Sequence, residues 1–269
     1  MRLDDYLRRL QQPAPADASV DTLRRLHLAH RETFLFENVT IQTGGAISLA
    51  LPDLERKFLD EGRGGYCFEH NTLFAAALRD AGFASTTLLG RVRRGPPERW
   101  ARTHMVLQVD VAGDPWLADV GFGATGLIEP MPLRDGAIVE QDGFTYRLRC
   151  DTGTWVLSMR DAAGIEADLY EFTGDPQTPM DVKVANHFTS THPESIFRTS
   201  LTIQRTTRAE RTILRSDALT RMRQGRVVDE PFAREQLRDV ARRLFDVELP
   251  RERLVFETTR DPLAGDLLG

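Results

Sequence analysis

Several residues in this sequence suit nucleophilic acyl chemistry, and a cysteine comes first. Cys67 comes just after the pair Gly64-Gly65 and stands where a helix is expected to begin. Free backbone N–H groups and the positive end of a helix dipole lower the pKa of a thiol there, which favours the nucleophilic thiolate. The other interpretation is a small buried hydrophobic side chain, and position alone leaves both open. Cys150 has none of these features, so it is predicted to be such a side chain.

A cysteine nucleophile needs a base, and two histidines are candidates. His70 lies three residues after Cys67, so on a helix the two share nearly the same face. His104 begins a strand-like segment in which Met105 and Leu107 point the other way. Each histidine could instead have a purely structural role, and spacing alone does not show which of the two would be the base.

An acid could orient the base. Asp119 ends a second strand-like segment, which is reached through a turn at 112–115. If Val111 pairs with Trp116, Asp119 and His104 share a face but lie two residue pairs apart, which is too far for a hydrogen bond. A bulge or a shifted register is then required. Without one, Asp119 is read as an ordinary turn-capping residue.

The elements that must position these residues change in character along the chain. Apolar residues recur at intervals of three and four up to residue 84, which predicts helices, the clearest of them over 66–81. Alternating patterns then predict closely spaced antiparallel strands, in a small barrel or sandwich, at 86–92, 105–111, 116–120, 145–149 and 154–159. Helices first and strands second indicate an α+β fold.

The last third of the chain is mixed. A connecting helix is expected over 181–192, and strands over 200–204 and 212–215. A final amphipathic helix is expected to open at Asp229-Glu230-Pro231. The predicted division is therefore a helical bundle at 1–84, a strand unit at 85–180, a connecting helix at 181–195 and a mixed unit at 196–269.

Composition excludes several classes of protein. Of 269 residues, 41% are hydrophobic, which is ordinary for globular domains. The net charge of −5 argues against nucleic acid as the main partner. With 2 Cys, no disulfide framework and no cysteine-rich zinc site can form, so no metal is expected. The sequence has no apolar run long enough for a membrane span, and a soluble cytoplasmic protein is expected.

Two further motifs are read as non-functional. The segment Gly121-Phe122-Gly123-Ala124-Thr125-Gly126 matches a dinucleotide-binding pattern, but the residues after it cannot open a helix, so the match is accidental. The stretch 205–226 carries many arginines separated by acidic residues and is interpreted as a solvated face.

The residues singled out above resemble one family, the arylamine N-acetyltransferases. The resemblance covers four strings: Phe36-Glu37-Asn38 in the N-terminal helices, Arg63-Gly64-Gly65-Tyr66-Cys67-Phe68-Glu69-His70-Asn71, Thr103-His104-Met105, and Asp119-Val120-Gly121-Phe122-Gly123. The chain order of Cys, then His, then Asp is similar too. The resemblance implies a helical bundle, a central antiparallel β-barrel and a C-terminal α/β lid around a cysteine-protease-like catalytic core.

The resemblance also implies roles for single residues. Cys67 would carry the acyl group, His104 rather than His70 would be the base, and Asp119 would orient it. An apolar acceptor pocket would be lined by Phe36, Phe68, Val92, Phe122 and Phe197, and the coenzyme A entrance would be bordered by Thr103 and Gly123. Backbone N–H groups near Cys67 and Thr103 would hold the oxyanion.

The implied activity is acetyl transfer from acetyl-CoA, as cosubstrate, to an arylamine, arylhydrazine or arylhydroxylamine by a ping-pong mechanism. Three alternatives stay open. A cysteine hydrolase or transglutaminase-like enzyme would share the triad, a macrolactam-forming amide synthase would take a carrier-bound acyl chain, and a binding module would keep a vestigial triad.

Overall fold

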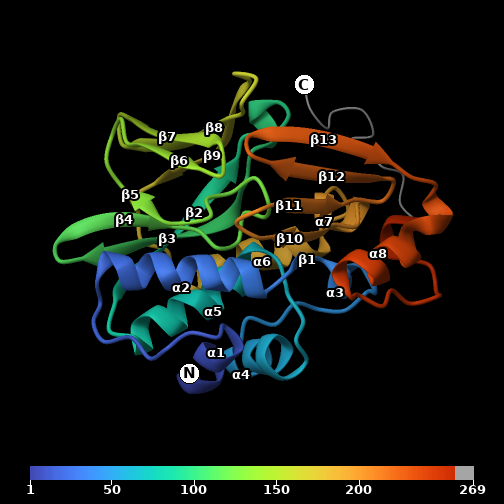
Figure 1. The fold of residues 1–269 in the computed structure, drawn as a ribbon, viewed down its shortest axis with the longest axis horizontal. Helices are drawn as coiled ribbons and strands as arrows, with labels where there is room; N and C mark the ends of the chain where they lie inside the picture. Colours follow the sequence, from blue (N-terminus) through green and yellow to red (C-terminus); the bar gives the residue numbers. More distant parts are fainter. Residues whose placement is uncertain (258–269) are drawn as a thin grey trace.

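The computed structural model describes residues 1–257, and the end of the predicted 196–269 unit, 258–269, lies outside them. A layer of helices lies beneath two antiparallel sheets that stand side by side (Figure 1). The α-helices are α1 Leu3–Arg9, α2 Val20–Thr33, α3 Val39–Gln42, α4 Leu51–Glu55, α5 Cys67–Asp80, α6 Pro179–Thr191, α7 Ile196–Thr199 and α8 Leu237–Phe245. A π-helical turn at Arg56–Asp60 continues α4, and single 3₁₀ turns lie at Pro97–Arg99, Arg234–Gln236 and Val255–Glu257.

The larger sheet has eight strands that curl into a nearly closed barrel. Its order is β5-β4-β3-β2-β9-β8-β7-β6, with β2 Ala84–Val92, β3 Arg102–Val111, β4 Asp114–Ala118, β5 Met131–Pro132, β6 Ile138–Gln141, β7 Phe144–Asp151, β8 Thr154–Arg160 and β9 Glu166–Thr173. The five strands predicted from alternation are present. The sequence analysis missed β9, β6 and β5.

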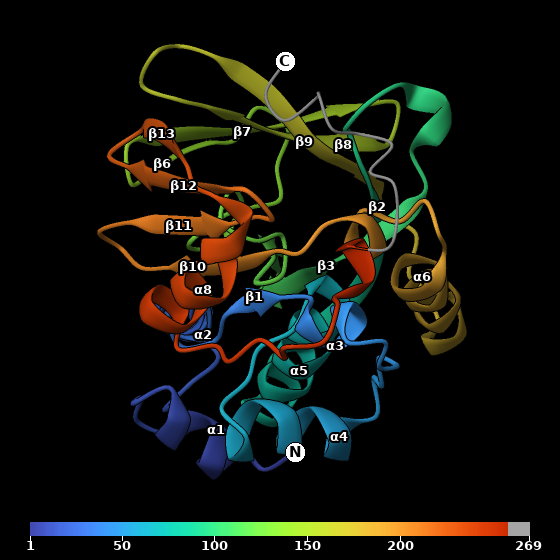
Figure 2. The ribbon, with the colours of Figure 1, turned by 90° about the vertical axis from the view of Figure 1, so that its right-hand side faces the viewer.

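The smaller sheet forms the α/β lid together with α8 (Figure 2). Its order is β1-β10-β11-β12-β13, with β1 Phe36–Glu37, β10 Ile203–Thr206, β11 Arg211–Leu214, β12 Ala218–Arg223 and β13 Arg226–Pro231. The predicted α+β class, with helices, barrel and lid, is confirmed.

Two local predictions are wrong. Asp229-Glu230-Pro231 ends strand β13 instead of opening a helix, because the turn at Gln224-Gly225, with φ of 49° and 75°, folds β13 back onto β12. Helix α8 begins only at Leu237. Phe36–Glu37, expected within helices, form strand β1 and pair with Gln204 and Ile203 of β10. The N-terminal segment is thereby built into the lid sheet.

The sequence at the start of α5 explains why this helix begins at Cys67. The Tyr66 N–H donates to the Glu69 side chain at 3.1 Å, so a first-turn acid satisfies a backbone donor that the helix itself leaves free. The inward face of α5 is apolar and buried at Leu73, Phe74, Ala77 and Leu78. This face packs into the same core as Cys67, which fixes the position of Cys67 relative to the barrel.

Candidate active site

Cys67 lies in the first turn of α5, against strand β3. Its side chain is buried, with 3% exposure, and its Sγ lies 3.7 Å from the carbonyl oxygen of Thr103, to which the thiol donates. Thr103 directly precedes His104 on β3. The cysteine and histidine singled out in the sequence are therefore brought together between a helix start and a barrel strand.

The electrostatics of the thiol differ from the sequence expectation. Burial raises the pKa of Cys67, and the Asp119 carboxylate adds to the rise, whereas backbone N–H groups of Met105 and Phe68 act to lower it. The helix start does supply a donor, but removing the thiolate from water outweighs it. A thiolate at this position therefore needs a cation beside it, such as protonated His104.

His104 and Asp119 form a buried pair. The Nε2 of His104 lies 2.8 Å from Oδ2 of Asp119, and their exposures are 2% and 0%. Burial by itself would raise the pKa of Asp119, but His104, Asn71 and the Gly121 N–H together lower it to about 2. An ionised carboxylate can only accept, so His104 Nε2 carries a proton and donates it.

The shifted register that the sequence analysis required is present. Val111 pairs with Asp114 rather than with Trp116, and the ladder continues to Leu107 and Ala118. Ala112 and Gly113 both have positive φ, at 56° and 91°, so the connection is a tight two-residue turn. The shift moves Asp119 two residues along β3 toward His104, within hydrogen-bond reach.

Asn71 and His27 complete the surroundings of Asp119, and the sequence analysis gave neither this role. Asn71 Nδ2 donates to Asp119 Oδ1 at 3.1 Å and to the Met105 carbonyl at 2.7 Å. The Asp119 N–H donates to His27 Nε2 at 3.1 Å, while His27 Nδ1 donates to the Ile128 carbonyl at 2.8 Å. Asn71 lies one helical turn after Cys67, and that spacing is the signal that could have found it.

Gly121 lets the segment after Asp119 approach Cys67 closely. A Cβ at position 121 would lie 2.8 Å from the Cα of Cys67 and 2.6 Å from Asn71 Nδ2. Real Cβ atoms do not approach that closely, so only glycine fits. The start of α5 and the segment after β4 are therefore packed backbone against backbone.

His70, the second candidate base, takes part in a different network. Its Nε2 donates to the Leu35 carbonyl at 3.0 Å, its Nδ1 accepts from His30 Nε2 at 2.8 Å, and His30 Nδ1 accepts from the Tyr6 hydroxyl at 2.7 Å. Both ring nitrogens of His70 are thus engaged away from Cys67. Burial lowers the pKa of His70 to about 3, so it stays neutral.

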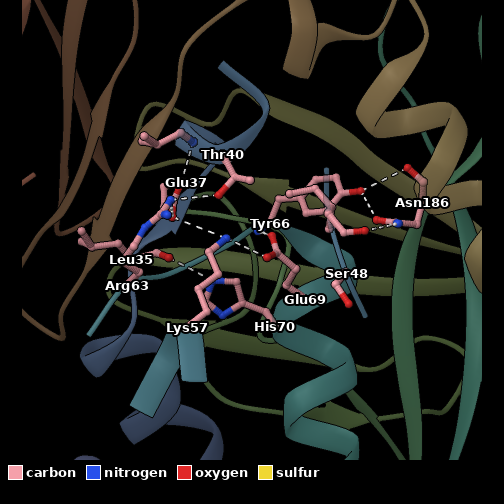
Figure 3. Close-up of polar contacts among 12 residues, drawn as sticks. Leu35, Glu37, Thr40, Ser48, Lys57, Arg63, Tyr66, Glu69, His70 and Asn186 are labelled. Carbon is pink, nitrogen blue, oxygen red and sulfur yellow. Dashed lines mark hydrogen bonds and ion pairs between the residues drawn. The ribbon is translucent and has the colours of Figure 1, made fainter. Parts of the chain in front are cut away.

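A buried charge network supports the start of α5 (Figure 3). Lys57 Nζ lies 2.7 Å from Glu69 Oε1 and 3.7 Å from Glu37 Oε1, and Arg63 Nη2 donates to Glu37 at 3.0 Å. The Tyr66 hydroxyl donates to Asn186 on α6. These contacts connect the loop before Cys67 to β1, to α4 and its extension, and to α6.

The residues expected to line an acceptor pocket fall into two groups. The Phe122 ring lies 4.9 Å from the His104 ring, and Tyr170, which the sequence analysis did not single out, also lies 4.9 Å from both rings. The ring centroids of Phe36 and Phe197 are 6.1 Å apart, and both side chains belong to or pack against the core that contains Cys67. Phe68 is fully buried against Tyr66, and Val92, half-buried, pairs with Tyr170 across β2 and β9.

The two residues expected at the coenzyme entrance belong to different segments of the chain. Thr103 supplies the carbonyl beside Cys67, and its N–H donates to the Ala101 carbonyl at 2.8 Å. Gly123 has φ of 84°, and its missing Cβ leaves space that the Gln204 side chain occupies, at 2.5 Å from that position.

The chain is similar to known proteins over most of its length. A family model described as N-acetyltransferase matches residues 19–254. The arylamine N-acetyltransferase / N-hydroxyarylamine O-acetyltransferase of Salmonella typhimurium is 36% identical over 230 residues, which cover 85% of this chain and 82% of the relative. The chain belongs to the arylamine N-acetyltransferase family. The family and enzyme class predicted from the sequence are confirmed.

Solved structures of this family share the fold. The Mycobacterium smegmatis arylamine N-acetyltransferase superposes with a TM-score of 0.87 at 33% identity, covering 96% of this chain and 97% of that chain. The Mycobacterium marinum arylamine N-acetyltransferase in complex with CoA gives a TM-score of 0.85 at 32% identity, covering 91% and 92%.

Within residues 1–257, none of the helices has both the length and the apolar character needed to cross a membrane. Across the same described range, no group of three or more His, Cys, Asp or Glu side chains is arranged to hold a metal ion.

Proposed function

We propose that Cys67, His104 and Asp119 transfer an acetyl group from acetyl-CoA to an arylamine, arylhydrazine or arylhydroxylamine through an acetyl-cysteine. The observation that carries this proposal is the buried His104–Asp119 pair at 2.8 Å, in which His104 directly follows Thr103, the residue whose carbonyl accepts the Cys67 thiol. Because Nε2 of His104 is held by Asp119, Nδ1 is the nitrogen free to act as a base.

In the first half-reaction, the proton moves from Cys67 Sγ to His104 Nδ1, and the sulfur attacks the thioester carbonyl. This transfer supplies the cation that a buried thiolate requires. The tetrahedral intermediate collapses by breaking the bond to the coenzyme A sulfur, which takes the proton from His104 and leaves as a thiol. The acetyl group remains bonded to Cys67.

In the second half-reaction, the amine nitrogen attacks the acetyl carbon while His104 accepts its proton. The bond to Sγ breaks, the N-acetylated product leaves, and the thiolate–imidazolium pair returns. Phe122 and Tyr170 cover His104 with aromatic edges and faces at 4.9 Å. Such a wall favours an aromatic acceptor over an aliphatic one, because ring contacts add to area burial.

An exchange experiment tests this sequence of steps. Without any amine, the protein should exchange labelled coenzyme A into acetyl-CoA, because the first half-reaction is reversible and needs no acceptor. Double-reciprocal plots against acetyl-CoA at several aniline concentrations should be parallel. Intersecting lines without exchange would rule out the acetyl-enzyme. Release of acetate with no transfer to aniline would indicate a hydrolase instead.

A further inference from the structure

Two buried arginines meet the turn that follows Asp119. Arg31, on α2, is 4% exposed, and Arg211, on β11, is fully buried. The sequence analysis read the stretch around Arg211 as a solvated face, and for this residue the interpretation is wrong. A guanidinium loses its hydration inside a protein, which costs several kcal/mol of free energy unless close partners replace the water. Where these partners lie is therefore informative.

Several of these partners are backbone carbonyls of one turn, 123–126. The others are the Thr206 hydroxyl for Arg31, and the Tyr146 hydroxyl, the Gln141 carbonyl and the Asp142 carboxylate for Arg211. Arg31 Nη2 donates to the Gly123 carbonyl at 2.7 Å, and Arg211 Nη1 donates to the carbonyls of Ala124 at 2.9 Å and Gly126 at 3.2 Å. The Tyr146 hydroxyl donates to the Gly126 carbonyl at 3.0 Å. Side chains from α2, the barrel and the lid thus fix successive carbonyls of the turn.

The 123–126 turn also fixes the position of Phe122, whose ring contacts His104. A Cβ at position 126 would lie 2.8 Å from the Phe122 Cβ and 3.3 Å from Arg31 Nη1, so the Phe122 side chain, Gly126 and the guanidinium are packed in series. The Phe122 and His104 ring centroids are 4.9 Å apart at an interplanar angle of 73°. A displacement of the turn would therefore move the ring that covers the base.

Helix α2 reaches the same segment at a second point. His27, one helical turn before Arg31, accepts the Asp119 N–H and donates to the Ile128 carbonyl. The segment from Asp119 to Ile128 is thus held at its start, its middle and its end. Burial lowers the pKa of Arg31 to about 10, with the charge of Arg211 adding to the effect, so the Arg31 guanidinium is charged at neutral pH.

We propose that Arg31 and Arg211 are positioning residues that hold the 123–126 turn, and through it Phe122, against His104. The proposal rests on the proposed function and deepens it: the two arginines set the rate of acyl transfer and the choice of aromatic acceptor without touching either substrate. Their carbonyl contacts place the wall of the acceptor site, while the reacting atoms belong to other residues.

Gly126→Ala tests the proposal with the least disturbance, because position 126 has an ordinary backbone conformation and the new Cβ presses on Phe122 and Arg31. We expect kcat/KM to fall about 10- to 100-fold for a substituted, wide arylamine and less for aniline, so that their ratio changes. Gly174→Ala is the matched control, since a Cβ there meets nothing within 4 Å.

Arg31 substitutions separate positioning from simple stability. Arg31→Gln should shift the same acceptor ratio at a temperature where circular dichroism shows the variant folded, and Arg31→Lys should restore part of it through one N–H···O bond. An unchanged ratio in both Gly126→Ala and folded Arg31→Gln would overturn the proposal. If Arg31→Gln does not fold, Gly126→Ala decides alone. Coenzyme A exchange by the wild type is independent of this outcome and reports on the acetyl-enzyme only.

Discussion

The Nε2 of His104 donates to Oδ2 of Asp119 at 2.8 Å, inside a site where neither side chain meets solvent appreciably. This bond fixes the tautomer of the imidazole and leaves Nδ1 as the basic nitrogen. The carboxylate is ionised because three donors, from His104, Asn71 and the Gly121 backbone, converge on it. The orientation of the His104 ring therefore depends on the Asp119 carboxylate, whose charge is buried and fully hydrogen-bonded.

Asp119→Asn should remove most of the activity while preserving the shape of the site. An amide can present its N–H to Nε2, which would favour the wrong imidazole tautomer, and it cannot stabilise an imidazolium. We expect kcat to fall about 100- to 10,000-fold. The measurement is aniline acetylation under saturating acetyl-CoA, with thermal unfolding as a check on folding. Near wild-type turnover in a folded Asp119→Asn protein would contradict the role of Asp119.

The choice of base is tested by treating the two histidines separately. His104→Ala should abolish acetylation and slow alkylation of Cys67 by iodoacetamide at pH 7, because burial alone raises the pKa of the thiol. His70→Gln should keep the activity but lower the free energy of unfolding by about 1 to 3 kcal/mol, since it leaves buried partners unsatisfied. The reverse pattern would make His70 the base.

Gly121→Ala should inactivate the protein by displacing the nucleophile. The added Cβ would require space 2.8 Å from the Cα of Cys67, where the opposing atoms are backbone and cannot rotate away. A displacement of about 1 Å in a reacting group costs on the order of 100-fold in rate. Acetylation kinetics of Gly121→Ala, compared with those of the Gly174→Ala control, provide the check. Equal rates in both variants would mean that the contact is not required.

Stability should fall as the pH drops below neutral, because three histidines are buried neutral. Burial lowers the pKa of His27 and His70 to about 3, and burial with neighbouring charges lowers that of His30 well below its usual range. The unfolded chain binds these protons near pH 6.5 and the folded protein does not, so their stabilisation is complete above pH 6.5 and is lost below it. Burial raises the pKa of Glu69, so this side chain acts in the opposite direction to the histidines and offsets part of the loss of stability at lower pH.

The expected loss in the free energy of unfolding is about 2 to 4 kcal/mol between pH 7 and pH 5.5. Urea unfolding at both pH values measures it. The His70→Gln variant serves as the matched control. It lacks one of the three buried histidines, so its free energy of unfolding should change less between the two pH values. Equal stability at the two pH values would show that the histidines are not held neutral.

Residue patterns predict the order of helices and strands, and the family resemblance adds the barrel and the lid. The roles of Cys67, His104 and Asp119 come from that resemblance and stay a prediction. Periodicity identifies α5 and β3, and parity places His104 and Asp119 on one face. The register remained open because Ala112-Gly113 is not one of the strong hairpin signals, although the positive φ of both residues makes the turn tight. One hydrogen bond of the candidate triad therefore depended on a turn that sequence pattern does not reveal.

Contacts between residues far apart in the sequence could not be predicted from the sequence either. Arg211 sits in a segment rich in charged residues, and nothing in the sequence distinguishes this fully buried arginine from the exposed Arg208. Arg211 is buried because β11 pairs between β10 and β12, and its side chain reaches the 123–126 turn. Tyr170 was missed for a similar reason, because β9 carries acidic residues that hid its strand pattern.

Intact-mass analysis tests the central claim most directly. After incubation with acetyl-CoA and no amine, the wild type and Cys150→Ala should each gain the mass of one acetyl group, and adding aniline should remove it. Cys67→Ala should gain nothing, because the acetyl group is predicted to reside on Cys67. An acetyl group on Cys67→Ala that aniline discharges, or none on the wild type, would contradict the acetyl-cysteine mechanism.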